Sequence, residues 1–168
     1  GCFRINSQIL PLKTHPQAGY VVKDLPDGAE IVALFKECGR FLKKNSLRAS
    51  LHPDQFVVLN SPKSEVVASS LAEIEYQTEV AGWVGADVIN IHAGGGYGDK
   101  PAALARFAES FARLSPEARR LLTIENDDKT YTPSDLLPLC HKLGVPLVYD
   151  VHHHRVLGDG LSVERATE

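Results

Sequence analysis

Short runs of apolar and β-branched residues alternate along the chain with segments in which apolar side chains recur every three or four positions. The short runs predict strands, and the wider spacing predicts amphipathic helices between them. Alternating strands and helices favour parallel βαβ units. The predicted strands are residues 2–6 (CFRIN), 47–51 (LRASL), 87–91 (DVINI), 121–124 (LLTI) and 146–149 (PLVY).

Helix-start signals mark two of the segments between these strands. Ser61 followed by Pro62 predicts a helix that continues to about Val84. Thr132, with Asp135 three residues later, predicts a capped helix start. Apolar residues at helical spacing indicate two further helices, around residues 31–42 and 104–114.

The length of the chain bounds the architecture. With 168 residues, we expect residues 1–168 to form a single α/β domain. Five β units suit an open parallel sheet or part of a (β/α)8 barrel, since a complete barrel typically needs about 250 residues. The chain begins with Gly1 and Cys2 and contains no methionine, so we interpret it as a piece of a longer protein.

Composition indicates a globular protein without a membrane span. Hydrophobic residues make up 43% of the chain and charged residues 23%, and no apolar run approaches the roughly 20 residues needed to cross a bilayer. The three cysteines are widely spaced and form no CxxC pair, which argues against a disulfide framework and a cysteine zinc site. We therefore expect reduced and mostly buried thiols and a cytoplasmic protein.

Potential metal ligands follow the predicted strands at equivalent places. They are His15 in the loop after the first strand, then His52, His92, Glu125 and Asp150 directly after the second to fifth strands. The carboxyl ends of parallel strands open onto one face of the sheet, where active sites of α/β folds lie. Because imidazole and carboxylate are the ligands of zinc, manganese and iron sites, the pattern predicts a metal site there.

The number of these ligands exceeds the needs of one ion, so we expect two or three divalent ions with a bridging carboxylate. Clustered ions activate a water nucleophile and stabilise a leaving oxygen, an arrangement used on phosphodiesters. The net charge of −3 argues against nucleic-acid binding, which usually shows a basic surface. Bound divalent ions would weaken that objection, because each adds two positive charges.

Two motifs beside the predicted ligands have open interpretations. The stretch HAGGGYGDK lacks the phosphate-loop spacing, and it is either a glycine-rich turn beside His92 or a place where a substrate phosphate approaches the backbone. In HPDQF, polar Gln55 precedes aromatic Phe56. Phe56 either packs in the core or is an exposed wedge that stacks against an unstacked base.

Several blocks in this order resemble the UV damage endonucleases, relatives of endonuclease IV and the xylose-isomerase-like barrels. The resemblance runs from the first residues to about His154. It is carried by FRINSQILP, THP, SLHPDQF, NIHAGGGYGDK, TIENDD and GVPLVYDVHHH.

The resemblance implies a partial TIM-type barrel that binds a cluster of divalent ions, commonly manganese, with zinc, magnesium or cobalt as alternatives. It implies damaged double-stranded DNA as partner, with no membrane and no obligate protein partner, and a prokaryotic cytoplasmic location with nucleoid association during repair. The implied reaction hydrolyses the phosphodiester immediately 5′ of a UV photoproduct, which leaves a 3′-hydroxyl and a 5′-phosphate and initiates alternative excision repair.

The resemblance also assigns residues. Glu125 and Asp150 take the catalytic role, as metal ligands that position the nucleophilic water. Gln55 and Phe56 match the pair that probes the gap left by a flipped lesion, although many relatives have tyrosine in place of Phe56. The implied metal ligands are His15, His52, His92, Glu125, Asp150 and His153.

Family features outside the match leave other functions open. Relatives have a strand before this match and further strands after it, which carry more metal ligands, so we expect the first and last barrel strands to be missing from this chain. The alternatives are an abasic-site endonuclease, a xylose-isomerase-like sugar isomerase or epimerase, and a metal-binding piece without catalysis. The extra His52 and His92 favour the nuclease over the sugar enzymes.

The triple histidine after Asp150 poses a separate choice. If the last strand continued past Asp150, alternation would place His152 on the same face as that carboxylate. The family spacing D-x-x-H points to His153 instead, and it requires the chain to leave strand geometry just after Asp150. No role follows from the sequence for His154.

Overall fold

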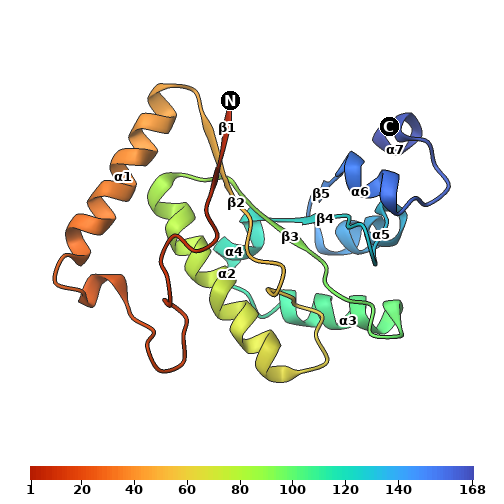
Figure 1. The fold of residues 1–168 in the computed structure, drawn as a ribbon, viewed down its shortest axis with the longest axis horizontal. Helices are drawn as coiled ribbons and strands as arrows, with labels where there is room; N and C mark the ends of the chain where they lie inside the picture. Colours follow the sequence, from red (N-terminus) through yellow and green to blue (C-terminus); the bar gives the residue numbers. More distant parts are fainter.

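Five strands pair side by side in the order in which they occur along the chain, and every pairing is parallel (Figure 1). The computed structural model describes residues 1–168. Sequential parallel strands joined by helices are the arrangement of a (β/α) barrel, so the predicted partial TIM-type barrel is confirmed. The strands are β1 (Cys2–Ile5), β2 (Arg48–Leu51), β3 (Val88–His92), β4 (Leu122–Glu125) and β5 (Leu147–Val148).

Helices connect the strands and cover one face of the sheet. Strand β1 forms one edge of the sheet, β5 forms the other edge and leads into α6 and α7, and α1 packs against α2 (Figure 1). No helix is both long and apolar enough to cross a membrane. The helices are η1 (Val22–Asp24), α1 (Gly28–Lys44), α2 (Ser64–Val84), α3 (Lys100–Phe111), α4 (Pro116–Leu121), α5 (Pro133–Leu143), α6 (Val151–Val156) and α7 (Val163–Thr167).

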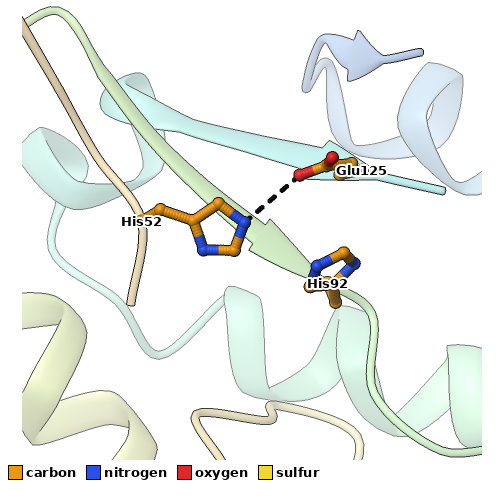
Figure 2. A group of neighbouring side chains, drawn as sticks. All are labelled: His52, His92 and Glu125. Carbon is orange, nitrogen blue, oxygen red and sulfur yellow. Dashed lines mark hydrogen bonds and ion pairs between the residues drawn. The ribbon is translucent and has the colours of Figure 1, made fainter. Parts of the chain in front are cut away.

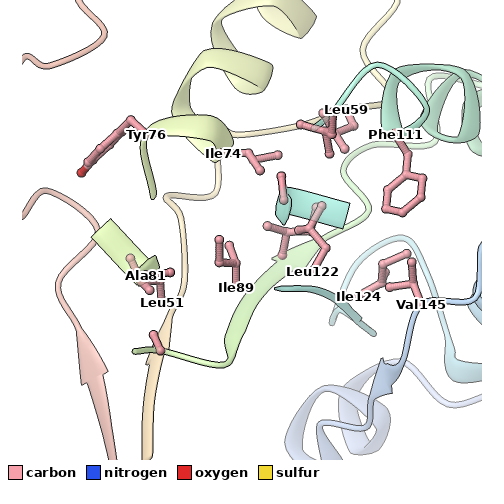
Figure 3. Packing of buried hydrophobic residues seen from close by; sticks show 14 of the residues in the cluster. Leu51, Leu59, Ile74, Tyr76, Ala81, Ile89, Phe111, Leu122, Ile124 and Val145 are labelled. Carbon is pink, nitrogen blue, oxygen red and sulfur yellow. The ribbon is translucent and has the colours of Figure 1, made fainter. Parts of the chain in front are cut away.

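The hydrophobic core lies between the sheet and the helices that cover it. Strand side chains such as Leu51, Ile89 and Ile124 are at most 1% exposed, and they belong to one cluster with Ile74 and Ala81 of α2 (Figure 3). Alternation along each strand sends these apolar residues to one face and their neighbours to the other. Apart from Val88, the residues on the second face of the three central strands are polar: Arg48, Ser50, Asn90, His92, Thr123 and Glu125. Of the three cysteines only Cys140 is buried, so the expectation of mostly buried thiols is wrong.

The helix α5 begins as its sequence predicts. The Thr132 hydroxyl accepts a hydrogen bond from the Asp135 amide (3.2 Å), and the Asp135 carboxylate accepts one from the Thr132 amide (3.0 Å). This capping box satisfies two amides that have no partner within the helix. The predicted capped start at Thr132 is therefore confirmed.

The predicted start of the second helix is wrong by two residues. We expected the helix to begin at Ser61–Pro62, but α2 begins at Ser64 with Lys63 as its N-cap. The Ser61 hydroxyl accepts a hydrogen bond from the Lys63 amide (3.1 Å). Ser61 and Pro62 therefore form a turn in front of the helix.

A short helix that was not predicted precedes the fourth strand. The Ser115 hydroxyl accepts a hydrogen bond from the Ala118 amide (3.1 Å), and Pro116 occupies the first turn of α4. Leu121 ends this helix, and the strand begins at Leu122. The prediction that the strand begins at Leu121 was wrong. The apolar run LLTI hides the boundary, because its first residue ends the helix and the other three belong to the strand.

Two helical glycines form a matched pair that tests the packing of α1 on α2. A Cβ atom at Gly39 of α1 would lie 2.7 Å from the Val84 carbonyl oxygen and 3.1 Å from the Val84 Cα, whereas one at Gly82 of α2 would contact nothing within 4 Å. We expect Gly39→Ala to lower the free energy of unfolding by about 1–3 kcal/mol through overpacking. Gly82→Ala should raise it by about 0.5–1 kcal/mol, because alanine loses less entropy in a helix.

Urea denaturation followed by circular dichroism measures both effects. Equal stabilisation by the two substitutions would show that α1 and α2 do not approach each other this closely in solution.

Candidate metal centre

Four neighbouring strands deliver histidine and carboxylate side chains to one end of the sheet. His92 and Glu125 are the last residues of β3 and β4, and they pair in the strand register. His52 directly follows β2, and Asp150 lies two residues beyond β5. The expectation that the carboxyl ends of the strands gather these residues is confirmed for the last four strands.

The Glu125 carboxylate is the common member of the group. It is only 7% exposed. Its Oε2 lies 3.3 Å from the His52 Nε2 (Figure 2) and accepts a short hydrogen bond from the Asn90 side-chain amide. Its Oε1 lies 3.8 Å from the His153 Nδ1. Because a buried carboxylate is unfavourable without compensation, this residue needs the cationic or donor groups around it.

His92 presents a buried nitrogen without a partner. Its Nδ1 is inaccessible to solvent and makes no hydrogen bond. Its ring lies between those of His52 and His153, with centroid separations of 5.3 and 5.4 Å. Burial lowers the pKa of His92, Glu125 partly opposes this, and the two neighbouring rings lower it further. The neutral imidazole that results is the form that binds metal ions.

Backbone carbonyls orient the other two rings. The His52 Nδ1 lies 3.0 Å from the Pro53 carbonyl oxygen, and the His153 Nδ1 lies 2.8 Å from the Asn126 carbonyl oxygen. A carbonyl can only accept, so each Nδ1 donates and each neutral ring keeps its lone pair on Nε2. The hydrogen bond to Glu125 raises the pKa of His52, although burial opposes it. A bound cation would replace the proton that this pKa favours.

The chain leaves strand geometry at Asp150, as the spacing of the resemblance requires. Asp150 is the N-cap of α6, and its carboxylate accepts a hydrogen bond from the His153 amide (2.9 Å). The first turn of that helix places the half-buried His153 within 3.9 Å of the Asp150 carboxylate and leaves His152 exposed. Partial burial opposes ionisation of Asp150, but the His153 amide and ring lower its pKa overall. Strand alternation, which pointed to His152, did not identify the residue that reaches the site.

His154 belongs to a different, buried network. The Tyr149 hydroxyl lies 2.6 Å from its Nδ1, and the Asp159 carboxylate lies 3.0 Å from its Nε2. The same carboxylate accepts a hydrogen bond from the Ser134 hydroxyl (2.6 Å). Both ring nitrogens of His154 are therefore engaged, and the network ties the segment after α6 to the start of α5.

Ligand atoms of these residues form two groups that share Glu125. One group is His52, His92 and Glu125, and the other is Glu125, Asp150 and His153; within each, the potential ligand atoms lie within 4.8 Å of one another. Imidazole and carboxylate together suit divalent transition metals. The orphaned His92 Nδ1 and the carboxylate shared by the two groups fit a site for divalent metal, which these five residues would hold.

A cavity of about 460 Å³ opens over this group, and none of its lining side chains is hydrophobic. It contains the five candidate ligands described above together with Gln55. Arg4 of β1 also lines it and adds a guanidinium to the site. Arg4 and Asn90 were not among the residues proposed from sequence, although Asn90 stands two positions before His92 and strand alternation could have found it.

Two predicted site residues lie outside this group. The His15 side chain is exposed, and its Nδ1 accepts hydrogen bonds from the amides of Gln17 (3.2 Å) and Ala18 (3.1 Å). The neighbouring Thr14 hydroxyl donates to Glu73 of α2 (3.0 Å), which anchors the loop to that helix rather than to the metal centre. The structure thus does not bring His15 to the other ligands. Phe56 is 77% exposed, so core packing of Phe56 was the wrong alternative.

Comparison with known proteins identifies a family and close relatives. A sequence profile described as "UV-endonuclease UvdE" matches residues 1–168. A UV DNA damage endonuclease from Bacillus cereus is 37% identical over 155 residues, which cover 90% of this chain and 47% of the relative. The chain spans about half the length of the curated Bacillus relatives it matches.

Solved structures show the same fold. The crystal structure of SacUVDE is 37% identical and superposes with a TM-score of 0.90, over 99% of this chain and 56% of SacUVDE. Endonuclease IV from Thermus thermophilus is 19% identical with a TM-score of 0.61, over 94% of this chain and 55% of that protein. At that identity the second likeness concerns the fold alone.

The adjacent histidines after Asp150 offer a matched test of metal binding. We expect His153→Ala to lower the amount of bound divalent metal, because it removes one of the three potential ligands in the group Glu125, Asp150 and His153. His152→Ala removes an exposed ring of the same size and should leave the metal content unchanged. Elemental analysis after dialysis against manganese measures both, and equal metal content in the two variants would contradict the assignment.

The buried network around Asp159 predicts a pH-dependent stability. The hydrogen bond from Ser134 is the largest cause that lowers the pKa of Asp159 to about 2, with burial opposing it and the Leu161 amide and His154 contributing. An aspartate has a pKa of about 3.9 when unfolded, so the ionised group stabilises the folded state above about pH 4. That contribution is lost as the pH falls toward about 2.

We therefore expect Asp159→Asn to lower the free energy of unfolding near neutral pH, with a deficit that shrinks between about pH 4 and pH 2. Urea denaturation of both proteins across this range measures the difference. A deficit that stays constant down to about pH 2 would show that the charge of Asp159 does not stabilise the fold.

Proposed function

The chain belongs to the UV-endonuclease UvdE family, and from this membership we propose that it carries the metal centre of a DNA repair endonuclease. The proposed reaction hydrolyses the phosphodiester 5′ of a UV photoproduct and leaves a 3′-hydroxyl and a 5′-phosphate. The proposed substrate is damaged double-stranded DNA, and the reaction would initiate excision repair.

One observation carries this proposal. Two groups of potential ligands share the buried Glu125 carboxylate at the floor of a cavity without hydrophobic lining. A shared carboxylate between two ligand groups suits paired ions, and paired ions clamp the attacking and leaving oxygens of a phosphodiester. The likeness to UV DNA damage endonucleases supports DNA as the source of that phosphodiester.

We propose two or three divalent ions, because the candidate ligands exceed the needs of one ion, and manganese as the metal, because the resemblance to the UV damage endonucleases implies it. His52, His92 and Glu125 would hold one ion, and Glu125, Asp150 and His153 a second. His15 stays a proposed ligand only if its loop rearranges. Bound ions would supply positive charge to the leaving oxygen and acidify a coordinated water.

In the proposed reaction the protein side chains have distinct roles. Glu125 and Asp150 would present oxygens that orient the nucleophilic water, and carbonyl hydrogen bonds from Nδ1 hold the His52 and His153 rings with the lone pair on Nε2. Gln55 lines the cavity over the metal centre, and the exposed Phe56 follows it in the same loop. We propose that these two side chains probe the gap from which the lesion is flipped.

Plasmid nicking tests the proposed activity. Supercoiled plasmid, either irradiated with ultraviolet light or left intact, is incubated with the protein and manganese, and relaxed product is counted on a gel. We expect relaxation of the irradiated plasmid only, and we expect loss of that relaxation in Glu125→Gln, which removes the charge of the shared carboxylate.

A depurinated plasmid serves as the third substrate. Relaxation of the depurinated plasmid without relaxation of the irradiated one would assign an abasic-site endonuclease in place of the photoproduct activity. Equal relaxation of irradiated and intact plasmid would contradict damage recognition.

A further inference from the structure

A second and larger cavity adjoins the metal centre. It has a volume of about 970 Å³ and is lined by the loop after β2, the loop after β3 and residues 127–130 after β4. Gln55, His92 and His153 line both this cavity and the smaller one over the metal centre. The two cavities therefore form one continuous groove, which we call the strand groove.

Two exposed aromatic side chains line the strand groove from different loops. Phe56, in the loop after β2, is 77% exposed, and Tyr97, in the loop after β3, is 50% exposed. Large aromatic side chains are usually buried in a globular protein, so a pair in one cavity marks a binding surface. Tyr97 belongs to the HAGGGYGDK stretch, whose purpose the sequence left open.

The backbone holds Tyr97 in a conformation that costs energy. Its φ is +49°, in the left-handed region that non-glycine residues rarely adopt. Such residues persist where their surroundings impose the conformation, and they concentrate at ligand-binding sites. The loop is tightly determined, since a Cβ atom at Gly94 would lie 2.3 Å from the buried Asn60 side chain.

Neighbouring groups fix the position of the Tyr97 ring. A Cβ atom at Gly95 would lie 3.2 Å from the ring, so the absence of a side chain there lets the ring lie against its own loop. The Arg106 guanidinium carbon lies 5.7 Å from the ring centroid, and the Arg106 Nε donates to the Asn60 carbonyl oxygen (3.0 Å). Tyr97 is therefore an aromatic surface that is ordered before any ligand arrives.

Two lysine side chains in the strand groove can contact phosphate groups. Lys63 and Lys129 line it, and neither forms an ion pair. The larger cavity is also lined by two carboxylates, Asp127 and Asp128, and that of Asp127 accepts hydrogen bonds from three successive backbone amides, which stabilise its negative charge. The two lysines and the two aspartates balance in formal charge, so the divalent ions proposed for the adjoining metal centre would supply the net positive charge of the strand groove.

We propose that Tyr97 stacks against an unpaired base of the DNA strand that passes through the metal centre, with Phe56 on the other wall of the strand groove. The proposal rests on the proposed nuclease function and adds a residue that contacts the strand. Exposed aromatic rings bind bases through their faces irrespective of sequence, and nearby lysines attract the phosphates between them. The occupant is thus a nucleotide rather than a sugar or a peptide.

Two substitutions at Tyr97 separate stacking from other roles. Tyr97→Phe keeps the ring and removes the hydroxyl, whereas Tyr97→Leu keeps an apolar side chain and removes the ring. Phe41→Leu is the matched control, because Phe41 is 61% exposed on α1 and does not line the strand groove. Thermal melting of each variant verifies that it folds.

The binding experiment uses a duplex with one defined photoproduct and a 2-aminopurine beside it, with calcium in place of manganese to hold back hydrolysis. We expect Tyr97→Leu to raise the dissociation constant about 5- to 150-fold, the range of base–aromatic stacking. It should also abolish the change in 2-aminopurine fluorescence on binding. Tyr97→Phe and Phe41→Leu should behave like the unmodified protein.

Each contrary result has its own meaning. Unchanged affinity and fluorescence in Tyr97→Leu, while the unmodified protein still nicks irradiated plasmid, would overturn stacking and leave the proposed function standing. Equal loss in Tyr97→Phe and Tyr97→Leu would assign a hydroxyl hydrogen bond and overturn stacking. Failure of the unmodified protein to bind or nick any DNA would overturn both proposals.

Discussion

The buried carboxylate of Glu125 is the group on which the rest of the site depends. It ends β4 on the face of the sheet opposite the hydrophobic core, where Asn90 and His52 contact it and His153 approaches it. A carboxylate in such a place is stable only if donors or cations surround it. The same requirement makes Glu125 a candidate metal ligand, because a bound divalent cation would compensate its charge.

Strand alternation allows one short sheet to support a hydrophobic core and a polar site together. Every second residue of β3 and β4 is buried against the helices: Ile89 and Ile91 in β3, Leu122 and Ile124 in β4. The residues between them face the site. The Thr123 hydroxyl donates to the Asn90 side chain (2.8 Å), and Asn90 in turn donates to Glu125. A layer of polar side chains thus positions the ligand layer above it, as outer-shell hydrogen bonds do in metal sites.

Much of this arrangement could be predicted from residues that obey a single local rule. The sequence and the geometry of parallel sheets were enough to predict the capping box at Thr132. They were also enough to predict that the candidate ligands after successive strands lie together: His52, His92, Glu125 and Asp150. The rule failed where two local signals compete. Ser61–Pro62 and Ser115–Pro116 are the same dipeptide, yet only the second caps a helix, because Ser61 forms a turn with Lys63 instead.

The sequence by itself determined which residue types follow which strand, and hence that imidazoles and carboxylates meet at one end of a partial barrel. The tertiary structure decided distances and directions. It places Glu125 in both groups of potential ligands, and α6 turns His153 toward the site while His152 stays exposed. It also keeps His15 on a loop that is anchored to α2. The physical reason is the range of the interactions. Alternation and capping act within a few residues, whereas ligand separations and loop anchoring depend on contacts between segments tens of residues apart.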